Sequence, residues 1–387
     1  MSRLEDMLRA LCPEGVEYSC LGEVCDFQRG STITANQAIE GDVPVIAGGQ
    51  KPSYYHNQAN RTGETIAVSS SGAYAGFVSF WTIPVFLSDS FSVNPHNRLV
   101  TKYVYYFLTN MQENIHEKKK GGGVPHVHGS DLSQIQIPVP PIVVQREIVR
   151  ILDNFTELAA ELAAELAARK KQYEYYRNTL LSFGENRERE RVKWLLLGQV
   201  AQFKYGYTDT AKNTGDVRFV RITDIGDNGK LQQMDCKYID ITEDNQSYLL
   251  EKGDILMART GATFGKTMMY AEDAPAVYAS FLIRVRFDDG TVLPAYYWHF
   301  AQSGLYWNQA NKLVSKAGQP QFNANALKMV SMPVPPIEEQ EKIVRLLDRF
   351  DVLSNDINIG LPAEIAARQK QYEYYRDKLL TFEEVSA

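Results

Sequence analysis

Two stretches of the chain carry apolar residues at the spacing of one face of an α-helix. The intervals in each stretch are three, four and three residues, at Tyr173, Tyr176, Leu180 and Phe183 and again at Tyr372, Tyr375, Leu379 and Phe382. A stripe of this kind needs a second helix to cover it. The pattern predicts helices over about 142–183 and 337–382. The simplest partner of each helix is the other one, running antiparallel.

The regions before these helices, about 16–137 and 192–332, have a different pattern. Short β-branched and aromatic runs alternate there with Gly, Asn and Asp clusters, which predicts mostly β structure. Short helices are expected at 103–108 and at its counterpart 296–301. A Pro-Val-Pro-Pro stretch should end each region in an extended segment, because proline disfavours helix. The predicted class is α+β, with two mostly-β domains alternating with two long helices that form an antiparallel coiled coil.

The second half of the sequence repeats the first. The matched segments are 21–24 and 197–200, Gly72-Ala73 and Gly261-Ala262, Ser90-Phe91 and Ser280-Phe281, Gly123-x-Pro125 and Gly318-x-Pro320, 138–142 and 333–337, and 172–177 and 371–376. The last pair reads Gln-Tyr-Glu-Tyr-Tyr-Arg in both copies, and an identity of six residues in register with the other matches does not arise by chance.

The repeat predicts five segments in a nearly circular, pseudo-two-fold order. They are an N-terminal helix over 1–15, globular domains over 16–137 and 186–332, and helical spacers over 138–185 and 333–387. At the offset of the first matched pair, Leu4 corresponds to Leu180 and Met7 to Phe183. The N-terminal helix therefore resembles the end of a spacer helix, and we expect it to pack near the C-terminal helix.

Composition limits the classes of protein that the chain can belong to. With 44% hydrophobic and 23% charged residues, the composition is typical of a soluble globular protein, and no window is apolar enough to span a membrane. The acidic start carries no signal peptide pattern, so a cytoplasmic location is expected. Four scattered cysteines indicate neither disulfides nor zinc. A net charge of −6 means that any DNA-binding surface is local or shared with a partner.

Two variable domains alternating with two near-identical helical regions, the second ending in Gln-Lys-Gln-Tyr-Glu-Tyr-Tyr-Arg (369–376), resemble the specificity (HsdS) subunits of type I restriction-modification systems. The likeness is greatest to the type IC group. The resemblance implies that each domain recognises half of a bipartite double-stranded DNA site. It also implies that the helices form a spacer and dock two methyltransferase subunits, which restriction subunits then join.

The same resemblance implies that adenine methylation with S-adenosylmethionine and ATP-dependent, Mg-requiring cleavage belong to the partner subunits. The sequence carries no catalytic pattern of its own. Asn94-Pro95-His96 lacks the second proline and the aromatic residue of an adenine-methylation tetrapeptide. The segment from Gly261 to Lys266 is one residue too short for a phosphate-binding loop, and a shared tight turn explains it better. No catalytic residue, cofactor site or metal site is therefore expected in this chain.

Three kinds of segment are candidates for DNA contact: the shared turns, whose flanking side chains differ between the copies, the cationic or amide-rich loops, and the residues after the first shared strand. A solvated loop and an ordinary strand exit are the alternatives for the second and third kinds. The candidates are Gln28, Arg29, Ser31, Thr32, Ser69, Ser70, Ser71, Tyr74, Lys118, Lys119, Lys120 and His126 in the first domain, and Lys204, Tyr205, Tyr207, Thr208, Arg259, Thr260, Thr263, Lys266, Lys312, Lys316, Gln319 and Gln321 in the second.

His116, His126 and His128 could suggest a metal site, but the second copy has Gln321 and Asn323 at the last two positions, which are not usual zinc ligands. The tyrosines of the helices could stack on bases, yet their identity in both copies favours packing and docking. The candidates for helix pairing and docking are Ile148, Leu152, Phe155, Tyr173, Tyr176, Leu180, Ile343, Leu347, Phe350, Tyr372, Tyr375 and Leu379. An enzyme with an unfamiliar site and a protein-binding scaffold remain as alternative functions.

The first helix contains Glu-Leu-Ala-Ala three times in tandem over 157–168, a strong helix-forming tract. The second helix is four residues longer over the matching stretch, 350–366 against 155–167, and is interrupted at Gly360-Leu361-Pro362. Four residues add roughly 6 Å and about 40° to an α-helix, so the apolar stripe nearly keeps its register.

Deleting residues 160–163 should therefore shorten the gap between the two DNA half-sites by about one base pair, given a rise of roughly 3.4 Å per base pair. Both half-site sequences should stay the same. Methylome sequencing of the deletion strain measures the gap, and an unchanged gap with retained activity would contradict a role of the helix as a ruler.

Overall fold

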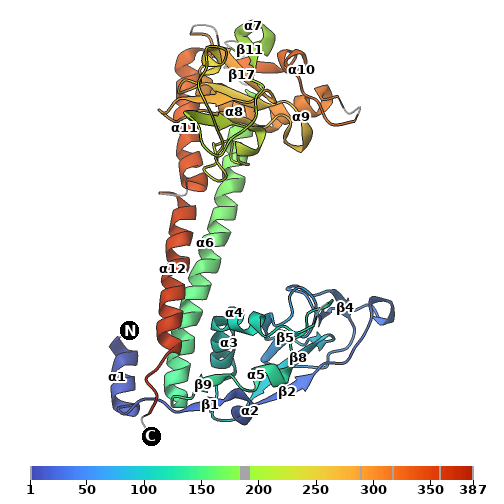
Figure 1. Ribbon diagram of the computed structural model, residues 1–387, viewed down its shortest axis with the longest axis vertical. Coiled ribbons are helices and arrows are strands. Elements are labelled where there is room, and N and C mark those ends of the chain that lie inside the picture. Colours follow the sequence, from blue (N-terminus) through green and yellow to red (C-terminus); the bar gives the residue numbers. More distant parts are fainter. Residues whose placement is uncertain are drawn as a thin grey trace. The chain divides into compact units, whose positions relative to one another are not determined.

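The computed structural model describes residues 2–121, 123–183, 192–287, 290–315, 318–356 and 359–385. Lys316, one of the candidates for DNA contact, lies outside these ranges. The chain folds as two compact units, unit 1 comprising Met1–Glu161 with Ile365–Ala387 and unit 2 comprising Leu162–Glu364 (Figure 1). Each unit therefore contains one globular domain, the beginning of one long helix and the end of the other.

The elements up to the first long helix are α1 (Ser2–Leu11), β1 (Tyr18–Cys20), α2 (Leu21–Val24), β2 (Cys25–Arg29), η1 (Ala35–Gln37), β3 (Val43–Ile46), β4 (Tyr54–His56), β5 (Thr65–Ser69), β6 (Val78–Trp81), β7 (Phe86–Leu87), β8 (Ser90–Pro95), α3 (Thr101–Asn110), α4 (Gln112–Glu117), α5 (Gly129–Leu132), β9 (Gln136–Pro138) and α6 (Ile142–Ser182). Helix α6 contributes residues to both units.

The elements after α6 are β10 (Lys193–Leu196), α7 (Leu197–Val200), β11 (Ala201–Tyr205), β12 (Val217–Val220), η3 (Ile222–Asp224), β13 (Tyr238–Ile239), η4 (Gln246–Tyr248), β14 (Ile255–Ala258), η5 (Gly261–Thr263), β15 (Thr267–Met269), β16 (Ala276–Tyr278), β17 (Leu282–Phe287), α8 (Pro294–Ala301), α9 (Gly304–Leu313), α10 (Ala324–Lys328), β18 (Ser331–Val334), α11 (Ile337–Asn355) and α12 (Leu361–Leu380).

The two globular domains have the same sheet topology. Unit 1 has a four-stranded sheet of order β2-β8-β5-β6, a three-stranded sheet β4-β3-β7 and a pair β1-β9, and unit 2 has β11-β17-β14-β15, β13-β12-β16 and β10-β18 in the corresponding places. In each domain the first strand pairs antiparallel with the last. The predicted α+β class and internal repeat are confirmed, as are the short helices α3 and α8.

The apolar stripes of the long helices are covered inside each unit. In unit 1 the ring of Phe155 on α6 lies 6.4 Å from that of Tyr372 and 5.5 Å from that of Tyr375 on α12. In unit 2 the ring of Phe350 on α11 lies 6.3 Å from Tyr173 and 5.2 Å from Tyr176 on α6. The beginning of one helix thus packs on the end of the other in both units, as expected for antiparallel partners.

The remaining pairing candidates surround these aromatic contacts. In unit 1 they are Ile148, Leu152 and Leu379, and in unit 2 they are Leu180, Ile343 and Leu347. Ile148, Leu152 and Leu347 are completely buried. These three side chains stabilise the unit that contains them and are not available to a partner subunit.

A buried glutamine joins each domain to its helix in the same way. The Gln145 side chain accepts a hydrogen bond from the amide of Val100 (2.8 Å), which precedes α3, and donates to Pro140 O (2.7 Å). Gln340 accepts from the amide of Leu293 (2.9 Å) and donates to Pro335 O (2.9 Å). A completely buried amide is tolerated because both its donor and its acceptor are satisfied.

The second long helix is interrupted as predicted, but the break precedes Leu361 and Pro362, which begin the next helix, and only Gly360 of the predicted three residues lies in it. Helix α11 ends at Asn355 and α12 begins at Leu361, whereas α6 is continuous through its Glu-Leu-Ala-Ala repeats. A β-carbon at Gly360 would lie 2.4 Å from the carbonyl oxygen of Val352, so only glycine permits this close approach.

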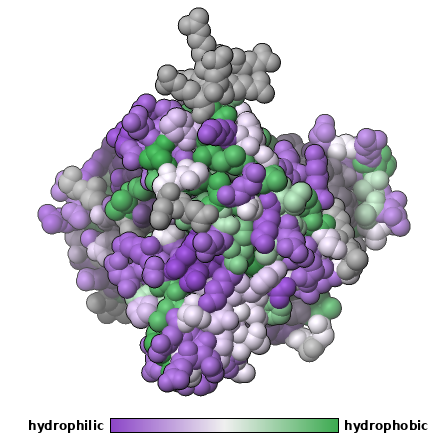
Figure 2. All heavy atoms as spheres, turned by 90° about the horizontal axis from the view of Figure 1, so that it is seen from above, coloured by the Kyte–Doolittle hydropathy of each residue, from purple (hydrophilic) through white to green (hydrophobic). Residues whose placement is uncertain are grey.

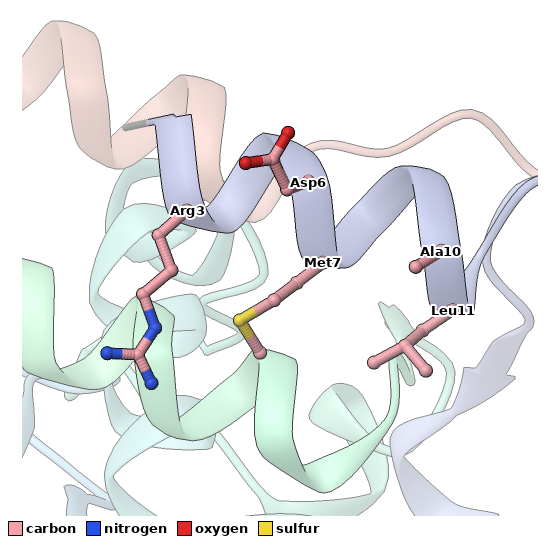
Figure 3. Close-up of a pocket in the computed structure, with 5 residues that line it drawn as sticks. All are labelled: Arg3, Asp6, Met7, Ala10 and Leu11. Carbon is pink, nitrogen blue, oxygen red and sulfur yellow. The ribbon is translucent and has the colours of Figure 1, made fainter.

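Helix α1 packs beside the C-terminal helix, as predicted from the repeat. Leu4 is buried in the same core cluster as Leu379, and Val16 donates a hydrogen bond to Glu383 O (2.9 Å). Figure 3 shows the Met7 side chain pointing from α1 toward α6, while Asp6 points away from it. The N-terminal segment therefore belongs to the core of unit 1.

No helix within the described ranges is long and apolar enough to cross a bilayer. The surface seen in Figure 2 mixes polar and apolar residues, and large apolar side chains exposed in unit 2 include Trp194, Tyr205, Phe281 and Met329. Single exposed apolar residues are ordinary on proteins, so exposure alone does not identify a functional surface.

We expect the helix contacts to dominate the stability of unit 2. Leu347→Ala removes a completely buried side chain and should lower the free energy of unfolding by about 2–5 kcal/mol. Leu346→Ala is the matched control, because the side chain of Leu346 is 40% exposed and its truncation should cost less than about 1 kcal/mol. Denaturant unfolding followed by circular dichroism measures both, and equal losses would contradict this assignment of the helix core.

Candidate nucleic-acid interface

The glycine turn predicted in both copies has one backbone structure. Gly72 and Gly76 have φ values of 85° and 82°, and Gly261 and Gly265 have φ values of 72° and 78°. Gly76 donates a hydrogen bond to Ser69 O, and Gly265 makes the equivalent bond to Ala258 O, each at 2.8 Å. The two segments are therefore shared tight turns that require glycine, and Gly261–Lys266 does not form a phosphate-binding loop.

A second segment pairs with this turn identically in each domain. Ser71 bridges His126 and Thr260 bridges Gln321 in antiparallel pairing. The amide of Val127 donates to Ser70 O (2.9 Å), and that of Phe322 donates to Arg259 O (2.7 Å). Ser70 therefore corresponds to Arg259, and His126 corresponds to Gln321.

The strand pairing corrects one of the matches made from the sequence. Gly30 donates to Ser90 O (2.8 Å), and its counterpart Gly206 donates to Leu282 O (3.0 Å). Ser90 therefore corresponds to Leu282, and the match of residues 90–91 with 280–281 is wrong by two positions. The hydrogen-bond ladder fixes this register, and a local two-residue likeness does not.

The corrected register reveals one pair of residues that the sequence analysis missed. The amide of Ser70 donates to Asp89 O and that of Arg259 donates to Phe281 O, both at 3.0 Å, so Asp89 and Phe281 are equivalent. Each precedes the first residue of its strand, β8 or β17. The signal that could have found them is the alignment of the two strands on their buried positions, since both strands have the same order of buried and half-buried residues.

Four equivalent positions now converge at one place in each domain, and we call them the four-position cluster. In unit 1 they are Arg29, Ser70, Asp89 and His126, which line a surface hollow of about 270 Å³. In unit 2 they are Tyr205, Arg259, Phe281 and Gln321. The backbone is shared, and all four side chains differ.

In unit 2 the cluster is organised around Arg259. Its guanidinium carbon lies 5.3 Å from the ring centre of Tyr205 and 5.4 Å from that of Phe281. Its Nε donates to Ser280 O (3.0 Å). The side chain of Gln321 donates to Thr260 Oγ1 (2.8 Å), on the residue that follows Arg259 in the chain.

In unit 1 the cluster combines a carboxylate, a hydroxyl group and two basic side chains. The Ser71 hydroxyl donates to the Asp89 carboxylate, and the ring of His126 stacks on that of His128 at 6.0 Å. Arg29 is exposed at the end of β2. These groups can both donate and accept hydrogen bonds, which is what base edges in a DNA groove require.

The other candidates of unit 1 flank this hollow. The Ser69 hydroxyl donates to Ala47 O (3.0 Å), and the side chain is buried, so it stabilises the turn and is not available to DNA. Lys119 Nζ donates to Ala73 O (2.9 Å), which ties the cationic segment after α4 to the same turn. The exposed candidates Tyr74, Ser31 and Thr32 lie in the turn and just after β2, with half-buried Lys118 in the cationic segment. Gln28, like Arg29, lies within β2 rather than after it.

Lys120 is held by an ion pair with Asp131 at 2.5 Å. Burial would raise the pKa of the Asp131 carboxyl, but hydrogen bonds from Lys120 and the His128 amide outweigh it, and the pKa lies below its ordinary value. The pair fixes the end of the cationic segment against α5.

Two lysines of unit 2 are engaged away from the cluster. Lys204 Nζ donates to Ser247 O (2.8 Å) and lies 4.0 Å from the ring centre of Tyr248. Burial and the nearby cations Arg284 and Arg286 lower the pKa of this ammonium group. Lys266 pairs with Asp227 at 2.5 Å, and this contact lowers the pKa of the Asp227 carboxyl. The ammonium groups of both lysines therefore have partners within the protein.

The remaining candidates of unit 2 are spread more widely. The ring of Tyr207 lies 5.3 Å from that of Tyr248, and Thr208 is exposed beyond it. Thr263 lies in η5 and donates to Thr260 O, exposed Lys312 lies in α9, and the Gln319 side chain lies beside Gly261.

The histidines do not form a metal centre. His116 Nδ1 lies 3.0 Å from Ala75 O, within hydrogen-bond reach, while His126 and His128 stack on each other. Among the residues that the structure describes, no group of three or more His, Cys, Asp or Glu side chains could hold a metal ion.

Comparisons with known proteins agree with this architecture. The family model described as "Type I restriction modification DNA specificity domain" matches residues 13–169 and 191–367. A putative type I restriction enzyme specificity subunit of Haemophilus influenzae is 31% identical, over 95% of this chain and 96% of that protein. The EcoR124I/EcoR124II specificity subunit of Escherichia coli is 30% identical, over 99% of this chain and 97% of that protein.

The fold is also similar to a crystal structure of the type I S subunit from M. genitalium, with a TM-score of 0.62 and 19% identity over 95% of this chain and 96% of that one. These matches do not assign a subgroup, and the likeness to the type IC group stays a prediction. The chain belongs to the family of non-catalytic DNA specificity subunits of type I restriction-modification systems.

Proposed function

We propose that each globular domain reads one half of a bipartite double-stranded DNA site through its four-position cluster. The observation that carries the proposal is the combination of one backbone frame with four changed side chains in the two domains. Shared geometry presents both clusters to a base edge in the same way, and different donors and acceptors select different bases. Lys118 of unit 1 supplies a phosphate contact next to its cluster, while Lys119 and Lys120 hold this segment through Ala73 O and Asp131.

The proposal assigns the long helices two roles. They set the gap between the half-sites, and they dock two methyltransferase subunits, with restriction subunits joining the assembly. The repetition of exposed side chains supports a stoichiometry of two. Tyr175 on α6 is 65% exposed, and its equivalent Tyr374 on α12 is 63% exposed. Each lies against the next tyrosine, at 5.6 Å for Tyr175 and Tyr176 and at 5.3 Å for Tyr374 and Tyr375.

The chain itself would need no cofactor in this role. S-adenosylmethionine, ATP and Mg would bind to the partner subunits, and the chain would act with them in the cytoplasm. Its own contribution is the choice of DNA sequence and the spacing of the complex on it.

Exchanging residues 192–332 for the second domain of another specificity subunit should change only one half of the recognised sequence. The reason is that this domain is closed by its own strand pair, β10 with β18, so the exchange leaves the frame of unit 1 intact. Methylome sequencing of cells carrying the complete system reads both half-sites. A change in both half-sites, or a parent motif that is not bipartite, would overturn the proposed function.

Lys118→Gln should weaken DNA binding by the assembled complex to a similar extent for every sequence. Removing one phosphate contact should also reduce the slope of log K against log salt by about 1. Arg9→Gln on the exposed side of α1 makes the same charge change elsewhere in unit 1 and should leave the slope unchanged. Fluorescence anisotropy over a salt series provides the measurement, and a slope equal to that of the parent would remove Lys118 from the interface.

A further inference from the structure

We propose that Arg259 reads a guanine in the second half-site, and that Tyr205 and Phe281 form an aromatic clamp that presents it. This inference rests on the proposed function, because it names the base and the residue that the second domain uses.

The arginine is fixed by its backbone and by its side chain. Its amide donates to Phe281 O (3.0 Å) and its carbonyl accepts from Phe322 N (2.7 Å). Its guanidinium lies between the rings of Tyr205 and Phe281, and its Nε is used by Ser280 O. An ordered arginine loses less conformational entropy when it binds than a free one does.

The outer edge of the guanidinium remains for a ligand. In the described part of the chain, Arg259 forms hydrogen bonds through Nε and its main chain, and both terminal amino groups are without a protein acceptor. Other arginines of unit 2 bind carboxylates, as Arg221 does with Asp224 and Arg286 with Asp254. The protein has a net charge of −6, so carboxylates are abundant, yet Arg259 pairs with none in the described residues. Its terminal amino groups can therefore donate to an acceptor outside the protein.

Guanine is the base whose edge this fork matches. The two terminal amino groups of an arginine can donate to guanine O6 and N7 in the major groove, which is the commonest specific contact in protein–DNA complexes. Phosphate can also accept two such bonds. A phosphate contact carries no sequence information, however, and the two domains could then share the residue. They differ here, since unit 1 has Ser70 at the position of Arg259.

The aromatic rings have no counterpart in unit 1 either. Tyr205 is 43% exposed and Phe281 is 51% exposed, and the equivalent residues of unit 1 are Arg29 and Asp89. The hydroxyl of Tyr205 accepts from the Ala324 amide (3.1 Å), which holds the ring in place. The clamp is thus a feature of the second domain that accompanies its arginine. Tyr205 and Phe281 are positioning residues, and Arg259 touches the base.

The test compares Arg259→Ala and Arg259→Lys in the complete complex with methyltransferase subunits. Duplexes carry the motif found by methylome sequencing, with each of the four bases at every position of the second half-site. For both variants, affinity for the parent site should fall roughly 5- to 150-fold at a single guanine, while affinity for the other three bases at that position stays nearly constant. The first half-site should be read as before.

The dependence on base identity separates a base contact from a phosphate contact. Lysine keeps the charge but lacks the planar fork, so Arg259→Lys should bind the guanine less tightly than arginine does. An equal loss for all four bases at that position, with a smaller salt slope, would show a phosphate contact and overturn the inference. Unchanged guanine preference in Arg259→Ala would overturn it as well.

Lys252→Ala is the matched control, since Lys252 is a 62% exposed cation that pairs with Asp273 beyond the opposite end of β14. It should leave both half-sites unchanged. Phe281→Ala should weaken the guanine preference without changing the salt slope, because the charge remains and only its positioning is lost. If a parent system reads two independent half-sites but Arg259 reads no guanine, this inference fails and the proposed function stands.

Discussion

The burial of an apolar helix stripe by the other repeat is the interaction on which the structure depends. Neither Phe155 nor Phe350 can be covered by its own helix, and each is covered by tyrosines from the end of the other helix. Unit 1 is consequently built from two distant parts of the chain, 1–161 and 365–387, while unit 2 is the continuous stretch 162–364 that contains the facing parts of both helices. The globular domains attach to these helices through the buried amides of Gln145 and Gln340.

Each domain has a shared backbone frame that carries side chains which differ between the two copies. The glycine turn, the segment paired with it and the strand that follows keep the same hydrogen bonds in both domains, from Gly76 and Gly265 to Val127 and Phe322. Side chains carried by this frame change chemistry without a change in backbone. Ser70 and Arg259 illustrate the range, since one offers a hydroxyl and the other a planar cation. Recognition of different bases needs this separation between a fixed frame and variable groups.

The negative net charge is compatible with DNA binding because some basic side chains are neutralised or held within the protein and others are not. Lys204, Lys266 and Lys120 are held by partners within the protein. Arg259 is held by rings and a carbonyl oxygen, which leave its charge uncompensated by a carboxylate. A cation's neighbours, more than its presence in the sequence, therefore decide whether it can serve a phosphate or a base.

The sequence by itself determined the repeat, the two helices and the turn, because these depend on local periodicity, identity and glycine, as in the six residues shared at 172–177 and 371–376. It also placed six of the eight cluster residues among the candidates, namely Arg29, Ser70, His126, Tyr205, Arg259 and Gln321. Only the tertiary structure decided which of them meet, and it added Asp89 and Phe281. The likeness of Ser90-Phe91 to Ser280-Phe281 misled the alignment, although Phe91 is buried and Phe281 is exposed. Strand register is set by pairing between distant segments and by which side chains face the core, and two matching residues in a short segment contain neither.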